Sequence, residues 1–162
     1  EEFAKRGAKI TVCGRNVEDL QKMADKVKKL SKHEALQIVG DVSDEAIQKR
    51  IIDETIAKFG KLDVLVNNAG FMIQPDHVSL PDILEIYDKV YKVNVRAPLG
   101  LINLAAPHLE KTKGNIVNIS SLQAFNPVSV EKFKIFTQMF FIIFLFPNRL
   151  IRFTVHQRQL LI

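Results

Sequence analysis

The sequence predicts an α/β protein whose parallel sheet is covered by helices on both faces. Short apolar runs alternate with longer segments of helical periodicity, and the connections between them are short. One run, residues 62–66, is apolar enough for a strand buried on both faces, and it leads directly into Asn67-Asn68-Ala69-Gly70. No internal repeat or low-complexity linker interrupts the chain before Leu122. A length of 162 residues suffices for one domain with a hydrophobic core.

The first half of the chain alternates strand and helix signals. Strands are expected at 8–14 and 36–40, because both segments are short and apolar. Gly7 is the expected C-cap of a preceding helix, and Asn16 the N-cap of the next one, which carries an apolar stripe at helical spacing. Ser43 is expected to cap a third helix, which Gly60 ends.

The second half continues the same alternation. The strand at 62–66 is followed by a loop with two prolines, by helical patterns at about 82–92 and 95–111, and by a strand at 115–119. The composition then changes abruptly, since seven of the eleven phenylalanines fall between Phe133 and Phe153. We therefore divide the chain into residues 1–124, a partial α/β domain, and residues 125–162, a divergent phenylalanine-rich tail.

The charge distribution argues against a nucleic-acid partner. Residues after Leu122 carry +4 of the formal net charge of +5, which leaves +1 for residues 1–122. The lysines at 22–32 cluster on a helix whose other face is apolar, which indicates a solvated face rather than a phosphate-binding surface. The apolar run 139–146 has eight residues, far fewer than the roughly 20 that span a bilayer, so no membrane partner is expected.

The single cysteine and the histidines indicate neither a disulfide nor a metal. Cys13 lies in an apolar strand pattern, as a buried structural thiol would, and it fits a reducing compartment. His33, His77, His108 and His156 lack the spacing of metal ligands. No targeting segment is visible, and we expect a cytoplasmic location.

Three motifs in a fixed order resemble the short-chain dehydrogenase/reductase family. They are Asn-Asn-Ala-Gly at 67–70, Asn94 in Val-Asn-Val-Arg, and the Ser120-Ser121 pair after the strand at 115–119. The resemblance covers residues 1 to about 124. It implies a doubly wound parallel sheet of the Rossmann type that binds NAD(P), and hydride transfer between the nicotinamide and a small-molecule carbonyl or alcohol.

The resemblance also implies the cofactor-binding residues. Arg15, at the end of the family's second strand, suits the 2′-phosphate of NADP, whereas an acid there would favour NAD. Asp41-Val42 matches the family's acceptor for the adenine amino group, although an Asp before a helix is also a common cap. Asn68, Ala69 and Gly70 match the motif that lets the cofactor ribose approach the backbone closely.

Two residues match the family's catalytic set. Asn94 is similar to the active-site asparagine whose backbone helps to hold a water in the proton relay. Ser121 matches the serine that hydrogen-bonds the substrate carbonyl, and Ser120 is the alternative by one register, because strand alternation makes it improbable that both point into the pocket.

Parts of the family pattern are missing from this chain. The glycine-rich phosphate loop would precede Glu1, and no Tyr-x-x-x-Lys follows Ser121, since the only tyrosines are Tyr87 and Tyr91. The main interpretation is an NADP-dependent oxidoreductase, and the alternative is a catalytically inactive fragment or an interaction module. The family commonly forms homo-oligomers through helices that include the tyrosine-bearing one, so the resemblance does not extend to assembly.

The missing first strand predicts an irregularity at the centre of the sheet. In the family order 3-2-1-4-5 that strand separates the strands at 8–14 and 62–66. The sheet therefore has to close directly, leave a gap, or accept another segment. Residues 139–146 are the candidate, because they have the all-apolar character of a central strand.

Overall fold

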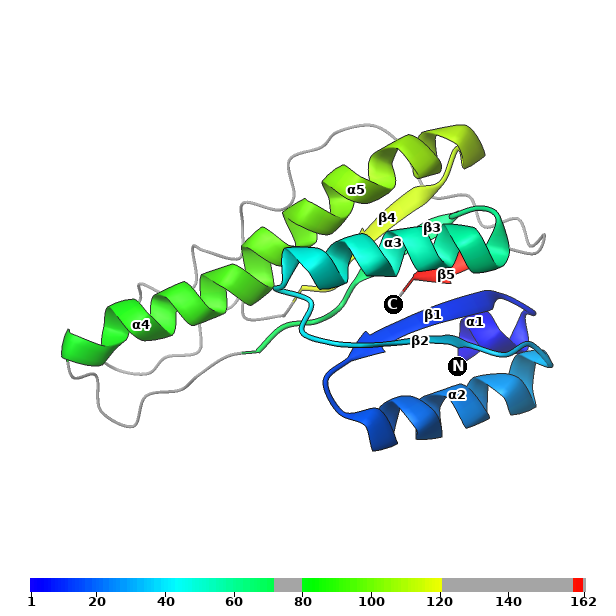
Figure 1. Cartoon of the computed structure of the whole chain (residues 1–162), viewed down its shortest axis with the longest axis horizontal. Helices are drawn as coiled ribbons and strands as arrows, with labels where there is room; N and C mark the ends of the chain where they lie inside the picture. The colour runs from blue at the N-terminus through cyan, green and yellow to red at the C-terminus, as the bar shows by residue number, and fades with distance from the viewer. Residues whose placement is uncertain (72–79, 121–158, 162) are drawn as a thin grey trace.

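The computed structural model describes residues 1–71, 80–120 and 159–161 of the chain, with backbone alone for 80–82 and 159–161. Its elements alternate as the sequence predicts (Figure 1). In chain order they are α1 (Glu2–Lys5), β1 (Lys9–Gly14), α2 (Val17–Ser31), β2 (Leu36–Val39), α3 (Glu45–Phe59), β3 (Val64–Asn67), α4 (Leu80–Tyr91), η1 (Lys92–Arg96), α5 (Ala97–Thr112), β4 (Asn115–Asn118) and β5 (Gln159–Leu161).

All five strands form one parallel sheet in the order β2-β1-β5-β3-β4. The four strands predicted from the apolar runs are present within two residues of their expected bounds. The sheet has neither the open gap nor the direct closure that were considered, because β5 lies between β1 and β3 (Figure 1). Gln159 pairs with Lys9, and Leu160 pairs with both Ile10 and Val64. The proposed filler, residues 139–146, lies outside the described residues.

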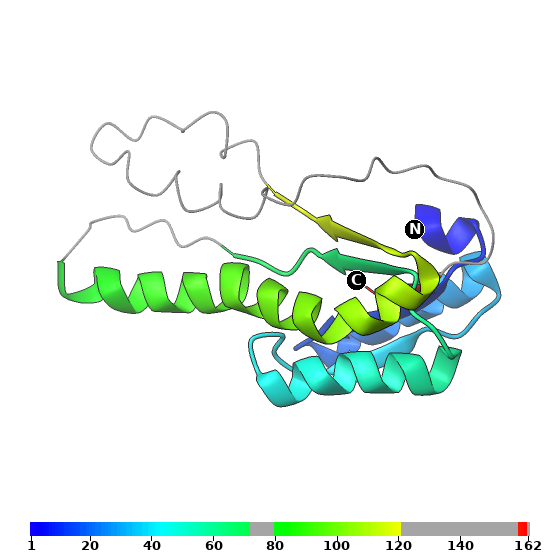
Figure 2. The ribbon, with the colours of Figure 1, turned by 90° about the horizontal axis from the view of Figure 1, so that it is seen from above.

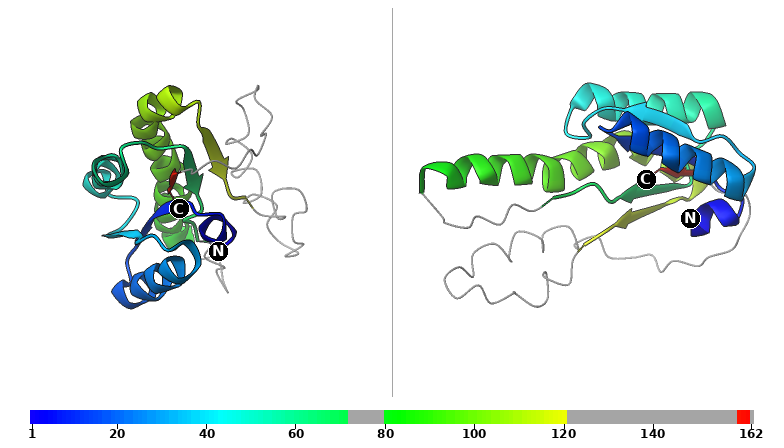
Figure 3. Two further views of the ribbon diagram at one scale, coloured as in Figure 1. Left: turned by 90° about the vertical axis from the view of Figure 1, so that its right-hand side faces the viewer. Right: turned by 90° about the horizontal axis from the view of Figure 1, so that it is seen from below.

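The helices pack on both faces of this sheet, as Figure 3 shows end-on. Alternate residues of β1 and β3 enter two separate apolar clusters, because successive strand side chains point to opposite faces. Ile10, Val12 and Val64 pack with α1 and α2, whereas Leu65 packs with α3 and α5. The fold is therefore the doubly wound α/β arrangement that the sequence predicts.

The helix caps correct one expectation. Asn16 caps α2 as predicted, and its Oδ1 accepts from the backbone N–H of Glu18 at 2.9 Å and of Asp19 at 3.2 Å. The cap of α3 is Asp44, whose Oδ1 accepts from Ala46 N–H at 2.8 Å, and Ser43 was the wrong choice. Ser43 instead belongs to the preceding turn, where its N–H bonds Asp41 Oδ1. Gly60 ends α3 in the left-handed conformation at φ 80°.

The two helices expected at 82–92 and 95–111 form one continuous helical run from Leu80 to Thr112 (Figure 2). They are joined by the π-helical turn η1, in which Ala97 N–H bonds the carbonyl of Lys92, five residues back. Pro98 is the second residue of α5, and because it has no N–H it adds no backbone hydrogen bond to the helical run at this junction. Such turns recur at functional sites, and η1 carries Asn94.

No helix among residues 1–71 and 80–120 combines the length and apolar character needed to cross a membrane.

A buried pair of threonines links the sheet to α3. Thr11 on β1 and Thr55 on α3 are both 0% exposed, and their hydroxyl oxygens lie 2.8 Å apart. Thr55 Oγ1 donates to the carbonyl of Ile51 at 2.6 Å, so its single hydrogen is used there. Thr11 must therefore be the donor to Thr55.

This direction of donation predicts an asymmetric mutational response. Thr55→Val should lower the free energy of unfolding by about 1–3 kcal/mol, because Thr11 is left as a buried donor without its acceptor. Thr11→Val should cost less than about 1 kcal/mol, since Thr55 keeps its bond to Ile51. The double variant should recover most of the Thr55→Val loss in urea unfolding. Equal costs for the two single variants would contradict the assignment.

Candidate functional site

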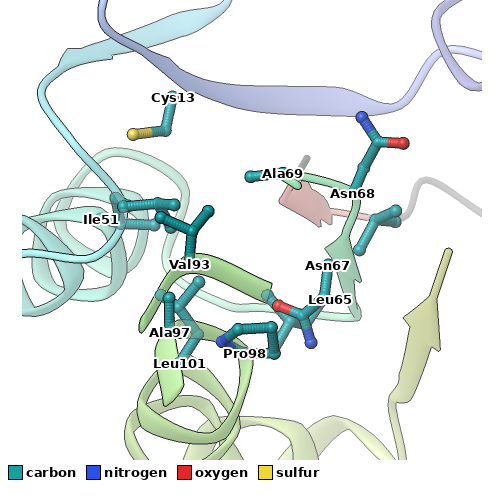
Figure 4. A pocket seen from close by; sticks show the side chains of 12 residues that line it. Cys13, Ile51, Leu65, Asn67, Asn68, Ala69, Val93, Ala97, Pro98 and Leu101 are labelled. Carbon is teal, nitrogen blue, oxygen red and sulfur yellow. The ribbon is translucent and has the colours of Figure 1, made fainter. Parts of the chain in front are cut away.

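A cavity lies at the carboxyl edge of the sheet, between β1, the turn after β2, the end of β3, and the helices α3, η1 and α5 (Figure 4). Its lining is mostly apolar, and Figure 4 shows Cys13, Ile51, Ala69 and Val93 arranged around the hollow. The complete lining is Cys13, Val42, Ile51, Leu65, Val66, Asn67, Asn68, Ala69, Val93, Ala97, Pro98 and Leu101. This edge is where open α/β sheets bind ligands.

Asn67 ties the end of β3 to β4. Its Nδ2 donates to Asn118 Oδ1 at 2.8 Å, between the residues that are paired in register. Ile119 N–H also bonds the carbonyl of Asn67 at 2.9 Å, so the chain leaves β4 beside the Asn-Asn-Ala-Gly turn. Asn67 is 8% exposed, and its Oδ1 has no hydrogen-bond partner among the described residues.

Asn94 holds the backbone beyond that turn. Its Oδ1 accepts from Phe71 N–H at 3.1 Å, and its Nδ2 donates to the carbonyl of Phe71 at 2.8 Å. The amide thus pairs with one residue's backbone as a neighbouring strand would. Gly70 lies against the same amide, since a Cβ at Gly70 would be 3.3 Å from Asn94 Oδ1. Asn68, Ala69 and Gly70 are exposed around this turn.

Asn94→Ala should free this turn. We expect a loss of about 1–2 kcal/mol in the free energy of unfolding, the sum for two partly exposed hydrogen bonds, and faster hydrogen exchange at Phe71 N–H. Asn103→Ala is the matched control, because Asn103 is exposed on the same helical run. Unchanged exchange at Phe71 would show that the Asn94 amide does not hold the turn.

Asp41 and Arg15 form an ion pair close to the cavity lining in the chain, since Asp41 directly precedes Val42, which lines the cavity. The Arg15 guanidinium lies 3.9 Å from Asp41 Oδ2, with the Arg15 side chain 81% exposed. Asp41 Oδ1 accepts from Ser43 N–H at 2.8 Å. The hydrogen bonds from the backbone and side chain of Ser43 lower the pKa of Asp41 below its ordinary value of 3.8, with smaller contributions from the charges of Arg15 and Lys92. Asp41 is therefore ionised at neutral pH.

Ser43→Ala should move the Asp41 pKa back upward, because the hydroxyl donor is lost while the backbone donor remains. A lowered pKa in the folded state stabilises the fold above the ordinary pKa, and this contribution disappears as pH falls through the folded pKa. The stability difference between wild type and Ser43→Ala should thus be fully present at neutral pH and be lost only in strong acid, as pH falls below 3.8 through the lowered pKa of Asp41. A carbon-detected NMR titration of Asp41, with urea unfolding at neutral pH and in strong acid, measures this. An unchanged Asp41 pKa would contradict it.

Of the remaining residues that the sequence analysis names, some lie at the cavity and one lies outside the described residues. Ser121 lies outside the described residues, and its neighbour Ser120 is exposed just after β4. Val42 lines the cavity. Cys13 lies half-buried at the same cavity, where burial raises the pKa of its thiol. No cluster of metal-ligating side chains occurs in the described parts of the chain.

Sequence reasoning missed the wall that the helical run contributes. Val93, Ala97 and Pro98 line the cavity together with Val42 and Ala69. Val93 belongs to η1, whereas Ala97 and Pro98 begin α5. Whether these residues face the sheet therefore depends on where the π-helical turn occurs, which the sequence does not indicate. The sequence offered one indication of this wall, because Val93 directly precedes Asn94 in the Val-Asn-Val-Arg motif.

The family model described as short chain dehydrogenase matches residues 1–132. The chain belongs to this family. Its curated relatives include the 11-beta-hydroxysteroid dehydrogenase-like 2 protein of Arabidopsis thaliana, 40% identical over 129 residues, and the L-fucose dehydrogenase of Mus musculus, 33% identical over 120 residues. These alignments cover 78% and 74% of this chain but 41% and 42% of the relatives. The chain thus spans about two fifths of their length.

Solved structures of short-chain dehydrogenases share this fold. A Caenorhabditis elegans short-chain dehydrogenase/reductase with cofactor is 38% identical, with a TM-score of 0.70, over 76% of this chain and 47% of that chain. The L-sorbose reductase of Gluconobacter frateurii, in complex with NADPH and L-sorbose, is 26% identical, with a TM-score of 0.68, over 78% of this chain and 48% of that chain. The family and the Rossmann-type fold expected from the motifs are therefore confirmed.

Proposed function

We propose that this chain carries the adenosine-binding part and two catalytic positions of an NADP(H)-dependent oxidoreductase acting on a small-molecule carbonyl or alcohol. The observation that carries the proposal is the apolar cavity at the sheet's carboxyl edge, whose lining residue Val42 directly follows Asp41, the ion-pair partner of Arg15. Residues 1–124 would form the nucleotide-binding part. Neither a nucleic-acid nor a membrane partner is proposed, and a cytoplasmic location fits the single half-buried thiol.

The cavity residues fit the adenosine half of the dinucleotide. Val42, Ala69 and Val93 supply apolar walls for a flat heterocycle. Asp41, ionised at neutral pH, is an acceptor for the adenine amino group. Arg15 can bind a 2′-phosphate with two parallel N–H donors, and its exposed pair with Asp41 at 3.9 Å is weak enough to rearrange. An arginine at this position therefore favours NADP over NAD.

The catalytic side of the proposal rests on Asn94 and Ser121. Bound NADPH would supply the hydride. Asn94, whose side chain is committed to Phe71, leaves its backbone to hold a water in the proton relay. The Ser121 hydroxyl would hydrogen-bond the substrate oxygen and polarise the carbonyl. The roles of Asn94 and Ser121 are inferred from family membership, and the role of Asn94 is also supported by the position of η1 at the cavity.

A second candidate function, dinucleotide binding without turnover, is favoured by the tyrosines. Proton donation in this family uses a tyrosine that follows the serine, and none follows Ser121 here. Tyr87 and Tyr91 stack on each other along the helical run, with ring centroids 5.6 Å apart. The two rings thus pack against each other, and neither of them lines the cavity.

Binding and turnover assays separate these functions. The purified chain should bind NADPH, and Arg15→Ala should weaken that binding by about 10- to 100-fold while barely changing NADH binding, the effect of removing a charged bidentate partner. Arg6→Ala is the control for the lost charge, because Arg6 is exposed after α1. Ketone reduction abolished by Ser121→Ala would establish the oxidoreductase. Binding without reduction would establish the second candidate, and no binding at all would refute both.

A further inference from the structure

Gln48 is a buried polar side chain in the first turn of α3 that none of the motifs includes. It is 4% exposed, and its Nε2 donates to the carbonyl of Val42 at 2.8 Å. Its own N–H bonds the carbonyl of the N-cap Asp44 at 2.9 Å, so the side chain projects from the rigid start of the helix. A glutamine is rarely buried unless its amide has specific partners.

Gly100 on α5 provides the space for this side chain. A Cβ at Gly100 would overlap Gln48 Oε1 and lie 3.1 Å from Gln48 Cδ. Gly100 has no positive φ, so the space and not the backbone conformation explains the glycine. Gln48 is therefore held between α3 and α5, which pack directly on each other.

The carbonyl that Gln48 holds belongs to the peptide group between Val42 and Ser43. That group is planar, so fixing its C=O also fixes the direction of the Ser43 N–H. The Ser43 N–H donates to Asp41 Oδ1 at 2.8 Å. One rigid peptide thus has Gln48 on its carbonyl side and the Asp41 carboxylate on its amide side. The Val42 side chain, on the same turn, lines the cavity.

We propose that Gln48, seated against Gly100, is a positioning residue for adenosine binding: it fixes the Val42–Ser43 peptide and so orients the Asp41 carboxylate and the Val42 wall toward the adenine ring. This rests on the proposed nucleotide function of the cavity. Gln48 itself does not line the cavity, and it acts through the turn.

The test compares Gln48→Met with wild type, because methionine keeps the length of the side chain and removes the donor. Adenosine 2′,5′-bisphosphate is the probe in titration calorimetry, and it should bind Gln48→Met about 5- to 10-fold more weakly, the ratio for one lost positioning hydrogen bond. The Asp41 pKa, followed by NMR without any nucleotide, should rise, because the Ser43 donor is no longer aligned. Gln21→Met is the control, since Gln21 is exposed on α2.

Gly100→Ala repeats the test from the other helix. The added methyl group pushes the Gln48 amide out of place while leaving its chemistry intact, so it should give the same two changes. If wild type does not bind the bisphosphate, the proposed function fails, and the Asp41 pKa still decides the role of Gln48. A lower melting temperature with unchanged affinity and Asp41 pKa in whichever variant folds would overturn the proposal, since that is a purely structural role.

Discussion

The distance between β1 and β3 is the constraint on which the site depends. Both are interior strands, and each must pair its backbone on two sides because buried peptide groups cannot be left without partners. With β5 between them, they lie two strand spacings apart, about 10 Å by the usual interval of roughly 4.8 Å. This spacing separates Cys13 at the end of β1 from Ala69 beyond the end of β3, and it sets the width of the cavity there.

The turns that follow β2 and β3, next to the cavity lining in the chain, are each held by polar side chains. Asn94 pairs with the backbone of Phe71 beyond β3, and Asp41 accepts from Ser43 beyond β2. Gln48 holds the opposite side of the same turn after β2. Turns carry few apolar contacts of their own, so these polar bonds substitute for packing. A site made largely of backbone and small residues can remain rigid in this way.

Local signals accounted for most of the fold. The apolar runs predicted four strands, and Asn16 and Gly60 were readable as caps because capping depends on a few neighbouring residues. Ser43 and Asp44 are equally good caps by type, so sequence could not choose between them, and the turn around Asp41 decided it. The bonds from the Asn94 side chain to Phe71 could not be predicted, because the two residues are 23 positions apart in the chain.

Long-range pairings explain the other omissions. Gln159–Leu161 has three residues and polar neighbours, so it acquires strand character only from β1 and β3 on either side. Gln48 looks like an ordinary polar residue near the start of a helix, and its burial depends on a glycine 52 positions later. Of the residues that line the cavity, Val42, Asn68 and Ala69 belong to motifs that the sequence shows, whereas the wall formed by Val93, Ala97 and Pro98 depended on the path of the helical run.

The position of β5 has a consequence for the folding pathway. Lys9 pairs with Gln159, so the central ladder joins residues 150 positions apart, whereas β1 pairs with β2 and β3 with β4 over much shorter loops. Closing a longer loop costs more chain entropy, and folds rich in such distant contacts form slowly. During synthesis β5 also leaves the ribosome after β1, β2, β3 and β4, the other strands of the described residues. We therefore expect the two strand pairs to form before β5 joins them, and a chaperone that shields their inner edges would act before the centre of the sheet is complete.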